Sequence, residues 1–396
     1  MKRSDGHILT THTGSLPRPP EILAAMRRKE EGTLVDEAAF EVSLAKNVAN
    51  IVARQVRLGI DIVNDGECGK PTFNSYQAER LTGYERRMPP GGVPVSTGPL
   101  SPDGRDARQF PDFYRSIVEH NPFEHCIRVA PRVCVGPVAY VGQGKLRRDS
   151  DNLRAALAAA GGGEAFIPAT SPIPDAPNEY YASEDDYALA YGDAMRTEYQ
   201  AILDAGFVLQ IDDPHMLSSW DKRREWTLPE FRAWAEHRVE LLNHALRGLP
   251  TERIRYHTCY GVNCGPRVSD LQLDEVIDLL FSIDAGAYSF EAANPRHEHE
   301  WRVFESRLVP EGKILIPGAV THSNPMIEHP QTVADRIERW AKVVGRENII
   351  VGNDCGFAST AGNAEIPMTI AWAKLEALAE GARIASQRLW PAARAA

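Results

Sequence analysis

Short apolar runs alternate with longer amphipathic segments along most of the chain. The runs are rich in β-branched and aromatic residues, whereas the longer segments place apolar residues at helical spacing. This alternation is typical of parallel β–α units. The runs are Ile8–Thr11, Ile60–Val63, Ala165–Pro168, Phe207–Ile211, Ile254–Tyr256, Ala287–Phe290, Ile314–Pro317 and Asn348–Val351. Eight strands with helices between them predict an α/β fold, a (β/α)8 TIM barrel.

Several helices between the runs have recognisable ends. The first is amphipathic and is followed by Gly59, a residue type that commonly ends helices. Pro229 fits the preference for proline in a first helical turn. The expected helices are Asp36–Leu58, Asp185–Ala205, Pro229–Leu246, Val268–Phe281 and Thr332–Val344.

The alternation is interrupted between the second and third runs. Residues 81–164 contain a Pro/Gly-rich stretch, an apolar run at 127–141 and a polar helix that ends in glycines. A long segment of this kind within a barrel is usually a functional excursion. We therefore expect one barrel domain over residues 1–396, with an insertion at 81–164 over its mouth. We also expect a β-hairpin at 127–141.

Composition and charge argue against a nucleic-acid or membrane partner. Hydrophobic residues make up 43% and charged residues 25% of the chain, the balance of a globular protein with a large core. The net charge is -10, and acids and bases are mixed, so no basic stripe is present for nucleic acid or an anionic membrane. No apolar run matches a membrane helix or a signal peptide. We therefore expect a cytoplasmic protein with no nucleic-acid or membrane partner.

Polar and ionisable side chains follow most of the predicted strands. In a (β/α)8 barrel the carboxyl ends of all strands open onto one face, which holds the active site. These side chains are therefore expected to converge. They lie at 12–15, 65–67, 212–215, 257–259, 291 and 353–355, with His322 a few residues after the seventh run.

The segment His257-Thr258-Cys259 is the most informative of these. Residues two apart in a strand point the same way, so an imidazole and a thiol are directed to one point. Glu291 and Cys355 follow later strands and can complete a four-ligand zinc set. The alternative is a buried thiol beside a hydrogen-bonded histidine. The six cysteines include no CxxC pair of the structural-zinc type, so the pattern favours a catalytic Zn²⁺.

The ligand types also favour one chemistry. Two thiolates and a carboxylate make zinc electron-rich and poorly suited to generating hydroxide from water. Such a site is better suited to holding a substrate thiol as a thiolate. The Glu291 carboxylate, the weakest ligand of the set, could give way to the substrate sulfur.

At these residues the chain resembles the catalytic barrel of cobalamin-independent methionine synthase and its short relatives, which include epoxyalkane:coenzyme M transferases. The resemblance runs from Thr10 to about Thr360 and is poor over 81–164. It implies that the metal ligands are His257, Cys259, Glu291 and Cys355.

The resemblance extends to the substrate. It implies that Thr13, Gly14 and Ser15 hold an amino-acid substrate, that Glu67 and Asp212 bind its ammonium group, and that His322 delivers a proton to the departing donor. The alternatives are that Glu67 and Asp212 cap helices and that His322 satisfies local hydrogen bonds. Arg18 is a further candidate for a substrate carboxylate or sulfonate, with a salt bridge as its alternative.

The chain also departs from the family. Full-length methionine synthases have an additional N-terminal barrel, and only the catalytic one is expected here. Ser218 stands where the family has a pterin-binding glutamate, and the stacking tryptophan has no clear counterpart in 169–181. The donor therefore stays open between a methyl-folate, a methyl-corrinoid protein and another alkylating molecule.

These patterns predict a zinc-dependent S-methyltransferase that acts on homocysteine or a similar small thiol. The alternatives are a thiol transferase that opens epoxides, a non-catalytic barrel with structural zinc, and a metal-free decarboxylase. The sequence leaves open whether the chain forms a homo-oligomer.

Overall fold

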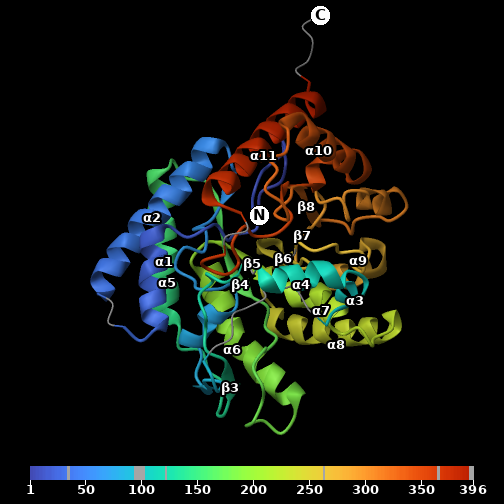
Figure 1. The fold of residues 1–396 in the computed structure, drawn as a ribbon. Helices are drawn as coiled ribbons and strands as arrows, with labels where there is room; N and C mark the ends of the chain where they lie inside the picture. Colours follow the sequence, from blue (N-terminus) through green and yellow to red (C-terminus); the bar gives the residue numbers. More distant parts are fainter. Residues whose placement is uncertain (34–35, 93–102, 121–122, 262–263, 364–365, 392–396) are drawn as a thin grey trace, which may run out of the picture.

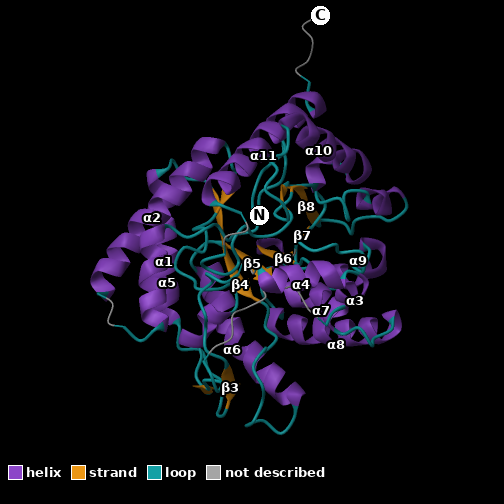
Figure 2. Ribbon diagram, in the orientation of Figure 1, coloured by secondary structure: helices purple, strands orange, loops and turns teal. Residues whose placement is uncertain are grey.

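A parallel sheet of seven strands forms the centre of the molecule. The computed structural model describes residues 1–33, 36–92, 103–120, 123–261, 264–363 and 366–391. The strands follow the order β1-β4-β5-β6-β7-β8-β9, and every neighbouring pair is parallel. Figures 1 and 2 show β4, β5, β6, β7 and β8 at the centre of the molecule. They are β1 Ile62–Val63, β4 Glu164–Thr170, β5 Val208–Asp212, β6 Ile254–His257, β7 Ala287–Phe290, β8 Ile314–Val320 and β9 Gly352–Asn353.

Residues 8–11 close this sheet into a barrel. On one side, Ile62 N donates to Thr10 O at 3.0 Å. On the other, Thr11 N donates to Val351 O and Val351 N donates to Leu9 O, both at 2.9 Å. The first apolar run therefore lies between β1 and the segment that leads into β9. This confirms the predicted (β/α)8 barrel.

Helices surround the barrel in a continuous ring. Neighbours in contact are α2–α5, α5–α6, α6–α8 and α8–α9, with η3 joining α9 to α10 and α11 joining α10 to α2. These elements are α2 Glu37–Leu58, α5 Gln143–Ala159, α6 Glu184–Asp204, α8 Leu228–Leu246, α9 Leu273–Phe281, η3 Glu300–Glu305, α10 Pro330–Val344 and α11 Met368–Leu389. The remaining helices are α1 Pro20–Glu30, α3 Arg105–Gln109, α4 Pro111–Glu119, α7 Pro214–Lys222, η1 Ser75–Glu79, η2 Thr251–Arg253 and η4 Arg346–Asn348.

Local chemistry sets the helix ends. Asp36 caps α2 by accepting from Ala39 N, and Gly59 ends it with φ 87°. Helix α9 begins five residues later than expected from the prediction Val268–Phe281, since Gln272 and Glu275 form a capping box there. The last apolar run also pairs later than predicted, because η4 includes Asn348 and the first bridge joins Ile349 to Leu315.

The segment between β1 and β4 contains two different kinds of structure. Its α5 belongs to the ring of helices, packed against α2 and α6. Its small antiparallel sheet pairs β2 Tyr84–Arg86 with β3 Arg132–Cys134. The β-hairpin predicted at 127–141 is therefore wrong, since β3 pairs with a strand outside that segment. An alternating apolar pattern indicates a strand but does not identify its partner.

Helix α3 of the same segment contacts both α4 and α7, and the three helices lie close together in Figure 1. The Arg105 guanidinium lies 3.7 Å from the centre of the Trp220 ring, and Asp106 N donates to Asp221 at 3.1 Å. No helix in the described part of the chain has the length and apolar character to cross a membrane.

Arg255 on β6 is a fully buried cation in the barrel interior. It donates to Gln210 Oε1 at 2.6 Å, Thr11 Oγ1 at 2.9 Å and His12 O at 2.8 Å. Its guanidinium lies 3.4 Å from the centre of the Phe166 ring. Burial lowers its pKa to about 9. One side chain thus joins β6 to β5 and to the closing segment 8–11.

We predict that Arg255→Met lowers the free energy of unfolding by about 3 kcal/mol, because buried acceptors lose their donor. Urea denaturation measures the change. Arg383→Met is the control, since Arg383 pairs with Glu380 on the surface of α11, and it should leave the midpoint unchanged. Equal effects of the two substitutions would contradict the structural role given to Arg255.

Candidate functional site

A cavity of about 270 Å³ opens at the carboxyl ends of the strands. Its walls come from loops that follow β1, β5, β6 and β9 and from residues 13–15, which follow the closing segment. Its lining residues are Thr13, Ser15, Glu67, Phe73, Asn74, Phe123, Asp212, Pro214, His215, Ser218, Lys222, His257, Cys259, Gly261, Cys355, Gly356, Ser359 and Thr360.

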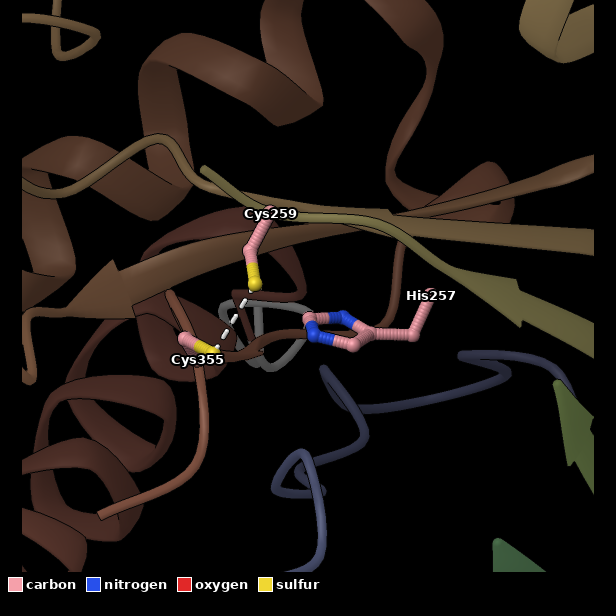
Figure 3. Close-up of side chains that lie close together, drawn as sticks. All are labelled: His257, Cys259 and Cys355. Atoms are coloured by element: carbon pink, nitrogen blue, oxygen red, sulfur yellow. Dashed lines mark hydrogen bonds between the residues drawn. The ribbon is translucent and has the colours of Figure 1, made fainter. Parts of the chain in front are cut away.

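Two thiols and one imidazole meet on one wall of the cavity (Figure 3). His257 ends β6, Cys259 lies two residues beyond it, and Cys355 follows β9. One ligand atom from each lies within 4.8 Å of the others, and the two Sγ atoms are 3.1 Å apart. All three side chains are buried.

The donor set fits a thiophilic metal such as Zn²⁺. His257 Nδ1 is buried and has no hydrogen-bond partner among the described residues. Burial, with smaller contributions from Arg255 and His322, lowers the pKa of His257 to about 3, so its imidazole is neutral, as ligation requires. The hydrogen bond with Cys259 and burial raise the pKa of the Cys355 thiol. Three zinc-type donors therefore lie together, and a tetrahedral ion would need one more.

Glu291, expected as the fourth ligand, lies outside this group. Its Oε2 accepts from Arg267 Nη1 at 2.7 Å and from Asn294 Nδ2 at 2.8 Å, while its Oε1 accepts from Tyr260 N at 3.0 Å. A second set of buried ligand atoms joins Glu291 to His322 and Asp354. The Glu291 carboxylate is thus near the thiols but held by other partners.

His322 does not line the cavity, and one of its ring nitrogens lies within 4.8 Å of ligand atoms of Glu291 and Asp354. Neither ring nitrogen makes a well-formed hydrogen bond within the described residues. Burial lowers its pKa to about 4, against a smaller opposing contribution from Asp354. A neutral imidazole of this kind can accept a proton and then pass it on.

Glu67 and Asp212 form an acidic wall in the cavity. Glu67 has the left-handed backbone conformation, with φ 53°, and its Oε2 is buried without a partner among the described residues. Asp212 Oδ1 accepts from Gln210 Nε2 at 2.7 Å. Burial raises the pKa of both carboxyl groups, and Glu67 raises that of Asp212 further. A bound cation would relieve both effects.

Residues 13–15, which follow the closing segment 8–11, supply a third wall. Thr13 N donates to Asn353 Oδ1 at 2.7 Å, which joins this segment to β9. Gly14 has φ 136°, and a Cβ there would lie 2.8 Å from Glu67 Oε1. Gly356 leaves room for Ser15 Oγ, which a Cβ would overlap. Two glycines therefore allow Ser15 and Glu67 to approach the cavity.

Arg18 is placed differently from the other candidates. Its guanidinium donates to the carbonyl oxygens of Leu16, Lys70 and Ala358, and it does not line the cavity. These bonds tie three loops together beneath the site.

The sequence did not single out one face of α7 that lines the cavity. His215, Ser218 and Lys222 lie three and four residues apart and share that face. Their spacing of three and four residues could have indicated a shared face, but only if this segment had first been predicted to be a helix. The predicted helices did not include α7.

The sequence matches the family described as cobalamin-independent synthase, catalytic domain, over residues 8–89 and 178–374. These ranges cover more than half of the chain. The chain belongs to this family. The unmatched segment between these two ranges, residues 90–177, includes α3, α4, β3, α5 and β4.

Relatives and solved structures extend the similarity to nearly the whole chain. A methionine synthase of Saccharolobus islandicus is 24% identical over 386 residues, which are 96% of this chain and 95% of that protein. One from Thermococcus kodakarensis is 24% identical over 384 residues, covering 96% and 94%. The structure of a B12-independent methionine synthase from Shewanella sp. W3-18-1 has a TM-score of 0.70 at 20% identity, covering 97% of this chain and 99% of that one. At this identity the structural likeness shows the fold.

We predict that Gly14→Ala lowers the free energy of unfolding by about 2 kcal/mol, because alanine is strained at this φ and its methyl group meets Glu67. Thermal unfolding measures the change. Gly144→Ala on α5 is the control, since nothing lies within 4 Å of its added methyl group. It should leave stability unchanged or slightly raised. A stable Gly14→Ala variant would contradict this account of the acidic wall.

Proposed function

We propose that this protein is a zinc-dependent S-methyltransferase that methylates homocysteine or a similar amino-acid thiol. The observation that carries the proposal is that the thiol–imidazole group and the acidic wall line the same cavity. Family membership supports a methionine synthase-like reaction. Phe123, from the segment between β1 and β4, also lines the cavity, which supports one domain with an insertion at its mouth.

His257, Cys259 and Cys355 would hold the zinc. When bound there, Zn²⁺ would lower the pKa of a substrate thiol, so that a nucleophilic thiolate persists at neutral pH. The protein's other side chains orient this thiol. Glu67 and Asp212 bind the ammonium group of the substrate, which compensates their buried negative charge. Ser15 Oγ lies beside Gly356 and can donate to the substrate carboxylate.

Transfer needs the alkyl donor opposite the fixed thiol. His215, Ser218 and Lys222 line the same cavity, and we assign the donor to the wall that they form. Fixing both reactants turns a bimolecular step into an effectively intramolecular one. The proton that the substrate thiol loses would reach the leaving group through His322 and intervening water, because His322 itself does not line the cavity. The donor is a methyl-folate, a methyl-corrinoid protein or a related molecule.

We predict that Cys259→Ala loses stoichiometric zinc, because one of the clustered donors is removed. Metal analysis after dialysis measures the zinc content. The control is Cys134→Ala, which changes a buried cysteine on β3 that does not line the cavity, and it should retain zinc. In cobalt-substituted wild-type protein, added homocysteine should intensify thiolate-to-metal absorption. An unchanged spectrum would indicate a sealed structural site and contradict the proposed activity.

We predict that Glu67→Gln and Asp212→Asn each raise the KM for homocysteine about tenfold or more, because a charge-assisted bond to its ammonium group is lost. Steady-state kinetics measure the change. The control substrate is the homocysteine analogue without the amino group, for which the variants should match the wild type. A larger loss with that analogue would exclude ammonium recognition.

A further inference from the structure

The residue that holds Glu291 is Arg267, in the loop between β6 and α9. Both side chains are buried, with 3% of Arg267 and 0% of Glu291 exposed, so their ion pair is shielded from water. Arg267 has φ 59°, an uncommon backbone conformation for a residue other than glycine. A strained and buried arginine of this kind needs a structural or functional reason.

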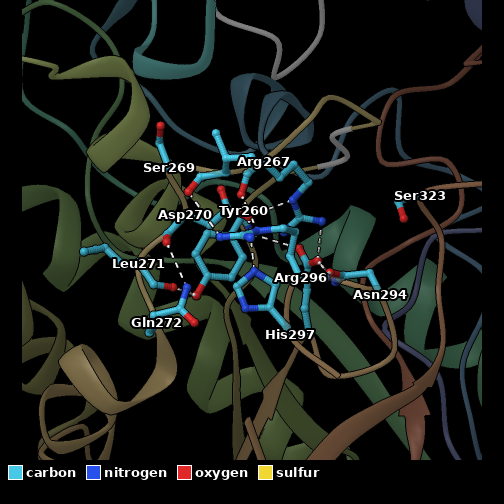
Figure 4. A network of polar contacts seen from close by, with 12 residues as sticks. Tyr260, Arg267, Ser269, Asp270, Leu271, Gln272, Asn294, Arg296, His297 and Ser323 are labelled. Carbon is cyan, nitrogen blue, oxygen red and sulfur yellow. Dashed lines mark hydrogen bonds and ion pairs between the residues drawn. The ribbon is translucent and has the colours of Figure 1, made fainter. Parts of the chain in front are cut away.

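Arg267 is fixed by a network that does not depend on Glu291 (Figure 4). Its Nε donates to Asp270 Oδ2 at 2.8 Å, and its carbonyl oxygen accepts from Arg296 Nε at 2.9 Å. Its guanidinium lies 5.2 Å from the centre of the Tyr260 ring. His297 stacks on the same ring at 4.4 Å. The guanidinium is therefore held in place before it meets Glu291.

Asp270 has a second cationic partner. His297 lies 3.1 Å from Asp270 Oδ2 and 3.0 Å from Glu300 Oε2. Burial disfavours the charged imidazole, but its hydrogen bonds with Asp270 and Glu300 outweigh burial and raise the pKa of His297 to about 9. Removing Arg267 would thus leave Asp270 paired, whereas Glu291 would lose its only cation among the described residues.

We propose that Arg267 is a positioning residue that competes with the bound metal for Glu291 and so keeps the fourth coordination position available to the substrate thiol. This inference rests on the proposed function. The Glu291 carboxylate cannot make its bonds to Arg267 and Asn294 and also act as an unhindered metal ligand. A weakened glutamate ligand yields readily to a thiolate, whereas an unopposed one would resist exchange.

The inference predicts that the loss of this buried arginine strengthens zinc binding. In Arg267→Met, Glu291 has lost its cation and should become a permanent ligand. Zinc should then bind roughly tenfold to a hundredfold tighter, the scale on which outer partners tune metal sites. Homocysteine should bind the metal correspondingly more weakly, because it must displace that carboxylate. A purely structural role would weaken metal binding instead.

The experiment measures zinc affinity against a chelating indicator and homocysteine affinity from thiolate-to-cobalt absorption. The variants are Arg267→Met, Arg267→Lys, Glu291→Gln and the double variant Arg267→Met/Glu291→Gln. Arg336→Met, which removes an ion pair with Glu298, is the matched control and should leave both affinities unchanged. Arg267→Lys keeps the positive charge but loses the planar guanidinium group, so both affinities should shift by an intermediate amount. This variant replaces Arg267→Met in the test if Arg267→Met does not fold.

Tighter zinc and weaker homocysteine in Arg267→Met, with both effects absent when Glu291 is already glutamine, support the inference. Wild-type affinities in a folded Arg267→Met protein that binds zinc overturn it alone. The inference alone is also overturned if zinc binding is tighter and homocysteine binding weaker by the same amounts in the double variant. A wild-type protein that binds no zinc overturns the proposed function together with this inference.

Discussion

The closure of the barrel by residues 8–11 is the constraint on which the site depends. Backbone hydrogen bonds join this segment to Ile62 on one side and to Val351 on the other, so it links β1 to the segment that leads into β9. Ser15 is thereby brought beside Gly356 and Gly14 beside Glu67, although these pairs are far apart in the sequence. The buried Arg255 reinforces the same closure from within the barrel. The site is therefore a consequence of the closed topology.

Two walls of the cavity carry different kinds of side chain. The thiols and imidazole on one wall suit a thiophilic ion. The two buried acids on another wall, Asp212 and Glu67 with its unpartnered Oε2, suit an ammonium group. An amino-acid thiol carries a partner for each wall on one short molecule. The same acids would repel the sulfonate of a coenzyme M-type thiol, so the arrangement favours the amino-acid substrate over the epoxide-opening alternative.

The sequence predicted the barrel and most of the site because both follow from strand periodicity. Polar residues lie just beyond the apolar runs, at the carboxyl ends of the strands. The sequence therefore predicts that His257, Cys259 and Cys355 lie close together. The position of Glu291 could not, since its carboxylate is directed by Arg267, a loop residue whose role depends on a tertiary network. The partner of β3 and the cavity face of α7 were likewise set by non-local packing.

The central claim is that His257, Cys259 and Cys355 bind a metal that accepts a further sulfur. X-ray absorption spectroscopy of the zinc-loaded protein tests it most directly by counting the sulfur atoms around the metal. The account predicts two sulfur ligands in the resting protein and an additional one when homocysteine is present. A coordination shell without cysteine sulfur, or one that homocysteine leaves unchanged, would contradict it.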